Sequence, residues 1–136
     1  MILIAKEKNI FGTLASLNLI KNKLENTNYN EAYASYLTLL KSNKENNIYK
    51  SIIALHGSYN LFDTVSSDKI KSLLSYIDEN LDSFKGYHYE ILFLLSIKDR
   101  NNQETEILYN QILENEKISE TIKDRIQKIS KFEKYK

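Results

Sequence analysis

The sequence predicts an all-α protein, a right-handed α-solenoid of about seven antiparallel helices. Apolar residues recur with the 3.6-residue period of an amphipathic helix, and strict alternation is rare. Proline is absent and glycine occurs only three times, so few strong breakers interrupt long helices. Residues 28–40 and 101–113 share one pattern, with a weaker copy between them. The equivalent positions Ala32, Ile70 and Thr105 lie 38 and 35 residues apart, which is typical of helical-hairpin repeats.

The first hairpin is expected at about residues 10–41. Its first helix ends near Asn26 and carries a single apolar stripe. This stripe consists of Leu14, Leu17, Ile20 and Leu24. Asn28 lies three residues before Glu31, which is the spacing of a capping box and predicts the start of the second helix. The polar stretch 42–47 is interpreted as the connection to the next hairpin.

The second hairpin is expected at about residues 48–81. Its first helix begins at Ile48 and places apolar residues on one face. Ser66 and Ser67 are natural N-caps for the following helix. The apolar face of that helix extends to Leu81, so we expect the hairpin to end there.

The third hairpin, at about residues 84–115, begins with a helix that is apolar nearly all round. Such a helix belongs in the middle of a stack, covered on two sides. Asn101 and Glu104 repeat the capping-box spacing and start the next helix. Ser119 caps a last helix, about residues 119–134, with an isoleucine stripe on one face and charges on the other. These two faces predict a C-terminal capping helix that closes a single repeat domain spanning residues 1–136.

Composition excludes several classes of function. The formal net charge is +1, with 19 basic and 18 acidic residues scattered along the chain, so no basic face for nucleic acid is expected. Cysteine is absent, which excludes disulfides and thiolate metal sites. The longest apolar run, residues 91–95, is far shorter than the roughly 20 residues of a membrane-spanning helix.

Candidate catalytic and metal-binding residues have simpler interpretations. His56 and His88 lie on different predicted helices without further ligands at helical spacing, so no metal site is predicted. The acidic residues Asp78, Glu79 and Asp82 lie near the end of a predicted helix and are expected to be solvated. The glycines are too far apart for a phosphate-binding loop. We therefore expect a protein that is not an enzyme and has no catalytic residue, cofactor or metal.

The repeated pattern resembles the second helix of a tetratricopeptide repeat. In that family an acidic residue precedes a small residue, with an aromatic residue four positions later and an apolar residue three further on. Glu31, Ala32, Tyr36 and Leu39 match these positions, and the copy at residues 101–113 matches in part. The proline that normally closes each repeat is missing throughout. The resemblance implies a divergent tetratricopeptide-like array that binds other proteins.

Four segments give a narrower resemblance, because their order and spacing are similar to the tetratricopeptide-like domain of the bacterial ancillary Sec translocon subunit. These segments are residues 36–40, 60–63, 89–92 and 122–127. The resemblance implies a location at the inner membrane, on the periplasmic side, with a translocon subunit, a periplasmic chaperone or a peptide segment as partner. It also implies that the membrane anchor is missing from this chain.

Two points remain open at this stage. Residues 2–5 are either the tail of a preceding element in a longer product or the first turn of the first helix. The protein is either the anchored periplasmic accessory or a cytosolic adaptor of the same architecture. Exposed apolar surface at an end of the solenoid would also allow the chain to form a homo-oligomer.

The partner is expected in the concave groove of the array, which is lined by the first helix of each hairpin. Several of the ten tyrosines do not fit the core spacing, and exposed aromatic residues are common anchors at interfaces. The repeat register predicts the residues that face this groove. They are Lys21, Ser58, Tyr87, Glu90 and Leu94.

Overall fold

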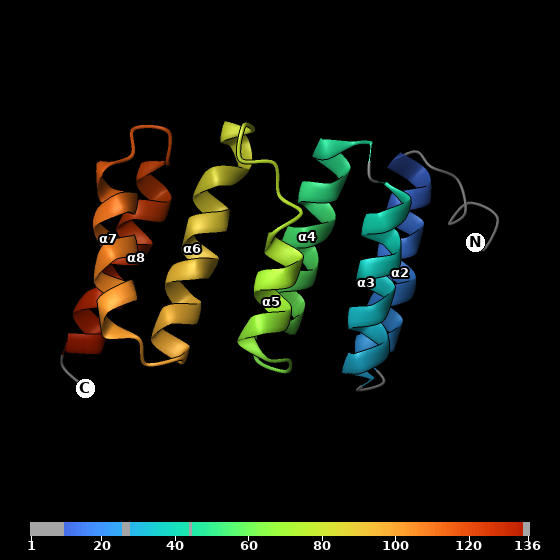
Figure 1. The fold of residues 1–136 in the computed structure, drawn as a ribbon, viewed down its shortest axis with the longest axis horizontal. Coiled ribbons are helices and arrows are strands. Elements are labelled where there is room, and N and C mark those ends of the chain that lie inside the picture. Colours follow the sequence, from blue (N-terminus) through green and yellow to red (C-terminus); the bar gives the residue numbers. More distant parts are fainter. Residues whose placement is uncertain (1–9, 26–27, 44, 135–136) are drawn as a thin grey trace. The chain divides into compact units, whose positions relative to one another are not determined.

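The computed structural model describes residues 10–25, 28–43 and 45–134. These residues form seven α-helices and no strand, so the all-α prediction is confirmed (Figure 1). The helices are α2 (Ile10–Glu25), α3 (Tyr29–Ser42), α4 (Asn47–Leu61), α5 (Ser67–Leu74), α6 (Asp82–Lys98), α7 (Asn102–Glu114) and α8 (Glu120–Lys134).

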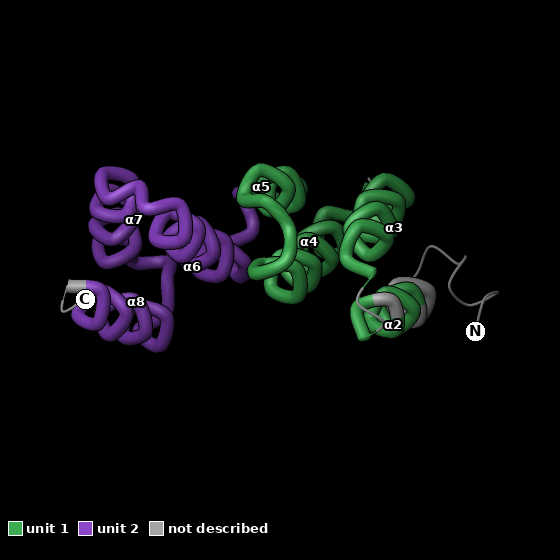
Figure 2. Tube along the Cα trace, turned by 90° about the horizontal axis from the view of Figure 1, so that it is seen from below, with its two compact units in different colours: residues 1–78 green, residues 79–136 purple. Residues whose placement is uncertain are grey.

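The chain divides into two compact units (Figure 2). Unit 1, residues 1–78, contains α2 to α5, and unit 2, residues 79–136, contains α6 to α8. Consecutive helices within each unit run antiparallel, as expected for hairpins (Figure 1). The solenoid arrangement of the whole chain and its right-handed twist remain predictions.

In unit 1, the two helical hairpins pack together around a residue of the repeated pattern. Tyr36 on α3 is fully buried, and its ring lies against Gly57 on α4. A Cβ atom at position 57 would come within 3.0 Å of Tyr36 Cγ and 3.2 Å of Leu73 Cδ1 on α5. The glycine therefore lets α4 approach both α3 and α5 closely.

Two predictions about helix ends in unit 1 are wrong. Asn28 precedes α3, but its side chain accepts no capping hydrogen bond, so the predicted capping box is not formed. The fourth predicted helix ends at Leu74 and not at Leu81. The chain turns after Leu74, where the Ser75 hydroxyl donates to the Ser72 carbonyl. Ile77 lies beyond the end of the helix but is buried. Because it continues the helical spacing of apolar residues, the sequence predicted a helix that is too long.

Unit 2 is built around an apolar cluster. The cluster contains Phe93 of α6, Leu108 and Ile112 of α7, Ile118 of the loop before α8, and Ile122 and Ile126 of α8. Gly86 lies where α6 meets α8, because a Cβ atom there would come within 2.6 Å of Ile122 Cδ1. The predicted isoleucine stripe of the last helix thus faces the interior of its own unit.

Predicted caps in both units are confirmed. Asn101 accepts a hydrogen bond from the Glu104 amide at 3.2 Å, and Ser119 accepts one from the Ile122 amide at 3.4 Å. Ser66 accepts from the Lys69 amide in the same way. These bonds satisfy amide groups that have no partner within their helix.

None of the helices within the described residues is long and apolar enough to cross a membrane. The apolar residues 2–5, whose role the sequence left open, lie outside the described part of the chain.

Candidate functional site

The five predicted groove residues are divided between the two units and differ in accessibility. Lys21 on α2 and Tyr87 on α6 are exposed, Tyr87 by 44% of its surface. Ser58 on α4 has no exposed surface, and Glu90 on α6 is 5% exposed. Leu94 packs against the core of unit 2. Ser58 and Glu90 are therefore not available to a partner as predicted, and Leu94 is only partly available.

The Glu90 carboxylate is used within unit 2. Arg125 of α8 donates from Nε to Glu90 Oε2 at 2.8 Å and from Nη2 to Glu90 Oε1 at 2.9 Å. This paired geometry is the strongest form of ion pair between these groups. A buried carboxylate needs such a partner, so Glu90 fastens α8 to α6.

Unit 1 has a hollow surface between the described parts of α2 and α3. It forms a groove of about 450 Å³, which is within the size range of ligand pockets. We call it the α2–α3 groove. Its lining residues are Ser16, Leu19 and Ile20 of α2 and Glu31, Ala34, Ser35, Thr38, Leu39 and Ser42 of α3.

The position of the groove follows from the register of α3. Tyr36 points toward α4, and Thr38 lies two residues later, roughly 200° around the helix. Ala34, Thr38 and Ser42 follow one another at four-residue spacing and therefore share this outer face. Their small side chains leave room between the two helices, and the aliphatic lining, including Leu19, makes the groove partly apolar.

Of the described residues that line the groove, Glu31 is the one that carries a charge. The hydroxyl groups of two other lining residues are already used, because Thr38 donates to the Ala34 carbonyl and Ser42 to the Leu39 carbonyl. Besides its serine residues Ser16 and Ser35, the described lining therefore offers an occupant apolar surface and one carboxylate. A basic, partly apolar occupant complements it best.

A second polar cluster connects α3 and α4. The Tyr36 hydroxyl lies 2.6 Å from His56 Nδ1, and Asn60 Nδ2 lies 3.2 Å from the same nitrogen. Burial raises the pKa of Tyr36 to about 12, with a smaller opposing effect from Asn60. Burial also lowers the pKa of His56, and the nearby Lys21 lowers it further. Both groups are therefore neutral at pH 7, as suits a packed structural contact.

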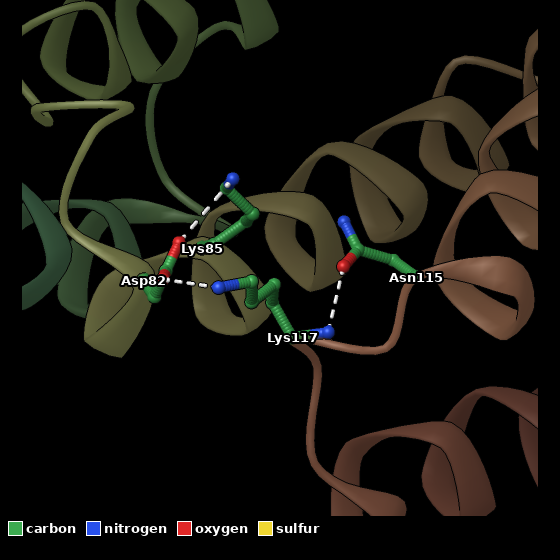
Figure 3. Close-up of polar contacts among 4 residues, drawn as sticks. All are labelled: Asp82, Lys85, Asn115 and Lys117. Carbon is green, nitrogen blue, oxygen red and sulfur yellow. Dashed lines mark hydrogen bonds and ion pairs between the residues drawn. The ribbon is translucent and has the colours of Figure 1, made fainter.

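A surface ion-pair cluster ties the start of α6 to the α7–α8 loop (Figure 3). Lys117 Nζ lies 3.1 Å from Asp82 Oδ2, and Lys85 Nζ lies 3.5 Å from Asp82 Oδ1. The Lys117 amide also donates to Asn115 Oδ1 at 2.9 Å, which holds the loop. The Lys117 ammonium group lowers the pKa of Asp82 by hydrogen bonding and by its charge. The carboxylate is solvent-exposed, so this cluster contributes little free energy.

Neither polar cluster has the arrangement of a metal centre. Across residues 10–25, 28–43 and 45–134, no three His, Cys, Asp or Glu side chains lie close enough together to hold a metal ion. The α2–α3 groove is thus the best candidate site. Sequence reasoning missed its α3 wall, although the small residues Ala34, Thr38 and Ser42 at four-residue spacing were a usable signal. No protein-family model, curated protein or solved structure matches this chain.

Proposed function

We propose that this protein is a non-catalytic protein-interaction module, which binds a helix or peptide segment of a partner in the α2–α3 groove. The groove itself carries the proposal, because it combines aliphatic side chains, small walls and one carboxylate. Amphipathic helices that bind in grooves present residues at positions i, i+3, i+4 and i+7 as anchors. Small wall residues such as Ala34 and Thr38 would let the backbone of such a helix approach closely.

The polarity of the groove defines the expected partner. Leu19 and Leu39 would contact an apolar side chain, and Glu31 would pair with a lysine or arginine on the same segment. An ion pair at an exposed rim mainly orients the partner, whereas the buried apolar anchor supplies most of the affinity. Tyr87 and Lys21, the exposed members of the set predicted from the sequence, remain secondary candidates for contact.

A selection experiment tests this function with a defined probe. We expect helical peptides selected from a displayed library against the full chain to carry apolar residues at helical spacing and a basic residue. The substitution Thr38→Trp fills the groove and should abolish their binding, whereas Ser72→Trp on exposed α5 should not. Circular dichroism confirms that both variants are folded. Equal binding to both variants would show that the groove is not the site.

The resemblance to the ancillary Sec translocon subunit supports a narrower proposal, in which the module is the periplasmic part of a membrane-anchored accessory of the translocon and its chaperones. It rests on the four sequence segments alone. A cytosolic adaptor is the alternative. Protease treatment of spheroplasts separates the two, because a periplasmic domain of the native gene product is degraded and a cytosolic one is protected.

A further inference from the structure

The α2–α3 groove calls for an occupant with an exposed apolar side chain close to a basic group. The chain itself contains such a side chain. Among the described residues, Phe132 on α8 is the most exposed large hydrophobic residue, with 63% of its surface accessible. The other exposed large hydrophobic residues have accessible fractions between 37% and 53%.

The charges around Phe132 complement the groove. Lys128 lies one turn before Phe132 on the same helix face, and Lys131 is its neighbour in the sequence; both lysines are exposed. The opposite face of α8, with Ile122 and Ile126, is buried in unit 2. The end of α8 thus carries an exposed aromatic residue that two exposed lysines precede in the sequence and Glu133 follows. Among the described residues that line it, the groove presents aliphatic side chains and the Glu31 carboxylate.

We propose that the α2–α3 groove of one copy of this protein binds the C-terminal end of α8 of a second copy. Phe132 enters the groove beside Leu19 and Leu39, and Lys128 or Lys131 pairs with Glu31. This inference rests on the proposed function of the groove as a helix-binding site and names its occupant.

The symmetry of this contact determines the assemblies that form. The groove belongs to unit 1 and Phe132 to unit 2, so the contact joins two different surfaces. A heterologous contact leaves one groove and one α8 end unoccupied in every dimer. Further copies can therefore add to the dimer and form rings or open chains. One aromatic anchor with a rim ion pair makes a small interface, and interfaces below about 1,200 Å² are typically weak. We therefore expect reversible association that increases with protein concentration and weakens with salt.

Sedimentation velocity of the full chain from about 10 µM to 1 mM, a range chosen for weak complexes, measures this association. The wild type should show an average mass that rises with concentration beyond that of a dimer. Phe132→Ser and Glu31→Lys should each reduce the association constant at least tenfold. Glu106→Lys makes the same charge change on exposed α7 and should leave association unchanged.

A charge exchange makes the test specific. In the variant Glu31→Lys, the groove and the end of α8 are both positively charged. In the double variant Lys128→Glu/Lys131→Glu, both surfaces are negatively charged. Each of these chains alone should remain monomeric. A mixture of the two should associate, because each groove then meets an α8 end of opposite charge.

Three outcomes overturn the inference. The wild type sediments as a monomer at all concentrations, Phe132→Ser associates like the wild type, or the mixture of the two charge variants stays monomeric. If any of these occurs while selected peptides still depend on Thr38, the groove binds another protein and the proposed function stands. If Thr38→Trp changes neither peptide binding nor self-association, both proposals fail.

Discussion

Tyr36 and Tyr109 occupy the same place in the two copies of the repeated pattern, but their surroundings differ. Tyr36 in unit 1 is fully buried, with its ring against Gly57 and its hydroxyl group 2.6 Å from His56 Nδ1. Tyr109 in unit 2 is only half-buried, and its ring centroid lies 6.5 Å from that of Phe93. The repeat places each tyrosine correctly along its helix, yet it does not determine how deeply the ring is buried.

The difference arises from the helix that follows each copy. After α3 comes α4, which offers a glycine for the ring of Tyr36 and a histidine for its hydroxyl group. After α7 comes α8, and Ile122 of this helix packs against α6 at Gly86 together with Ile118 of the preceding loop. The burial of a repeat residue therefore depends on side chains of the next element. A pattern confined to one helix contains no information about them.

Replacing each of the two tyrosines by alanine should give the largest difference in the loss of stability between the units. We expect Tyr36→Ala to lower the free energy of unfolding by about 3–5 kcal/mol, the usual cost of removing a buried aromatic ring. Tyr109→Ala should cost less than half as much, because its ring already contacts solvent. Urea denaturation of the full chain gives the totals, and native-state hydrogen exchange assigns each loss to residues 29–78 or 82–134.

The conservative variant Tyr36→Phe controls for the ring. It removes the hydroxyl group near His56 and keeps the apolar contact with Gly57, so it should cost only about 1 kcal/mol. Equal losses for Tyr36→Ala and Tyr109→Ala would contradict the difference in burial on which this comparison rests.

The two glycines at helix contacts should also respond differently to alanine. At Gly57 the new Cβ would meet the ring atoms of Tyr36 at 3.0 and 3.1 Å, and a ring held by its neighbours cannot move aside. Overpacking of this kind costs about 1–3 kcal/mol, which exceeds the roughly 1 kcal/mol that alanine gains in a helix.

At Gly86 the nearest atom is Ile122 Cδ1 at 2.6 Å, the mobile end of a side chain that can rotate away. We therefore expect Gly57→Ala to destabilise unit 1 and Gly86→Ala to be nearly neutral in unit 2. Thermal unfolding of both variants, with exchange rates for each unit, is the measurement. A larger loss for Gly86→Ala would mean that Ile122 is held as firmly as Tyr36.

Most of the fold could be predicted from the sequence, because helix formation leaves local signals. The 3.6-residue period of apolar residues predicted each of the helices that the described residues form, and caps such as Asn101, Ser66 and Ser119 predicted where several of them begin. The end of α5 was missed because Ile77 continues the apolar spacing beyond Leu74, although the backbone has already turned. Local periodicity identifies buried residues, but it does not separate a helix from the turn that follows it.

The candidate site could be predicted only in small part. Glu90 was expected to face the groove because of its place in the repeat register, but Arg125, 35 residues later, pairs with it inside unit 2. That pairing depends on how α8 packs, which no local pattern shows. The sequence did not predict the α2–α3 groove, because the repeat pattern placed the binding surface on the first helix of each hairpin. An outer face made of small residues such as Ala34 and Thr38 creates space without any distinctive chemistry.

The two histidines offer a smaller and pH-dependent comparison. Burial lowers the pKa of both His56 and His88; Lys21 adds to this effect at His56, whereas Glu79 opposes it at His88. Below about pH 6.5, the usual pKa of histidine, the unfolded chain binds protons that the folded chain does not. Stability present above that pH should therefore be lost progressively as the pH falls.

NMR titration of the two imidazole rings provides the measurement. Lys21→Ala should raise the pKa of His56, and Glu79→Gln should lower that of His88, each by less than the effect of burial. The variant His56→Gln should reduce the loss of stability below pH 6.5. No change in either pKa would mean that burial alone controls both rings.

The smallest expected effect concerns a strained residue in unit 2. Arg100 follows α6 with a φ angle of 57°, the left-handed region that glycine adopts most easily. The Asn101 amide donates to the Ser96 carbonyl and the Arg100 amide to the Ile97 carbonyl, which together form the Schellman motif that commonly ends helices.

An L-residue in this conformation costs roughly 1–2 kcal/mol, whereas glycine carries an entropic cost of about 0.5–1 kcal/mol on folding. Arg100→Gly should therefore stabilise unit 2 by less than about 1 kcal/mol, while unit 1, where the described residues have no positive φ angle, should not change. Lys98→Gly, within the last turn of α6, is the control and should destabilise the same unit, because glycine is a poor helix former. If both substitutions destabilise unit 2, the contacts of the Arg100 side chain stabilise the unit by more than the strain of its backbone destabilises it.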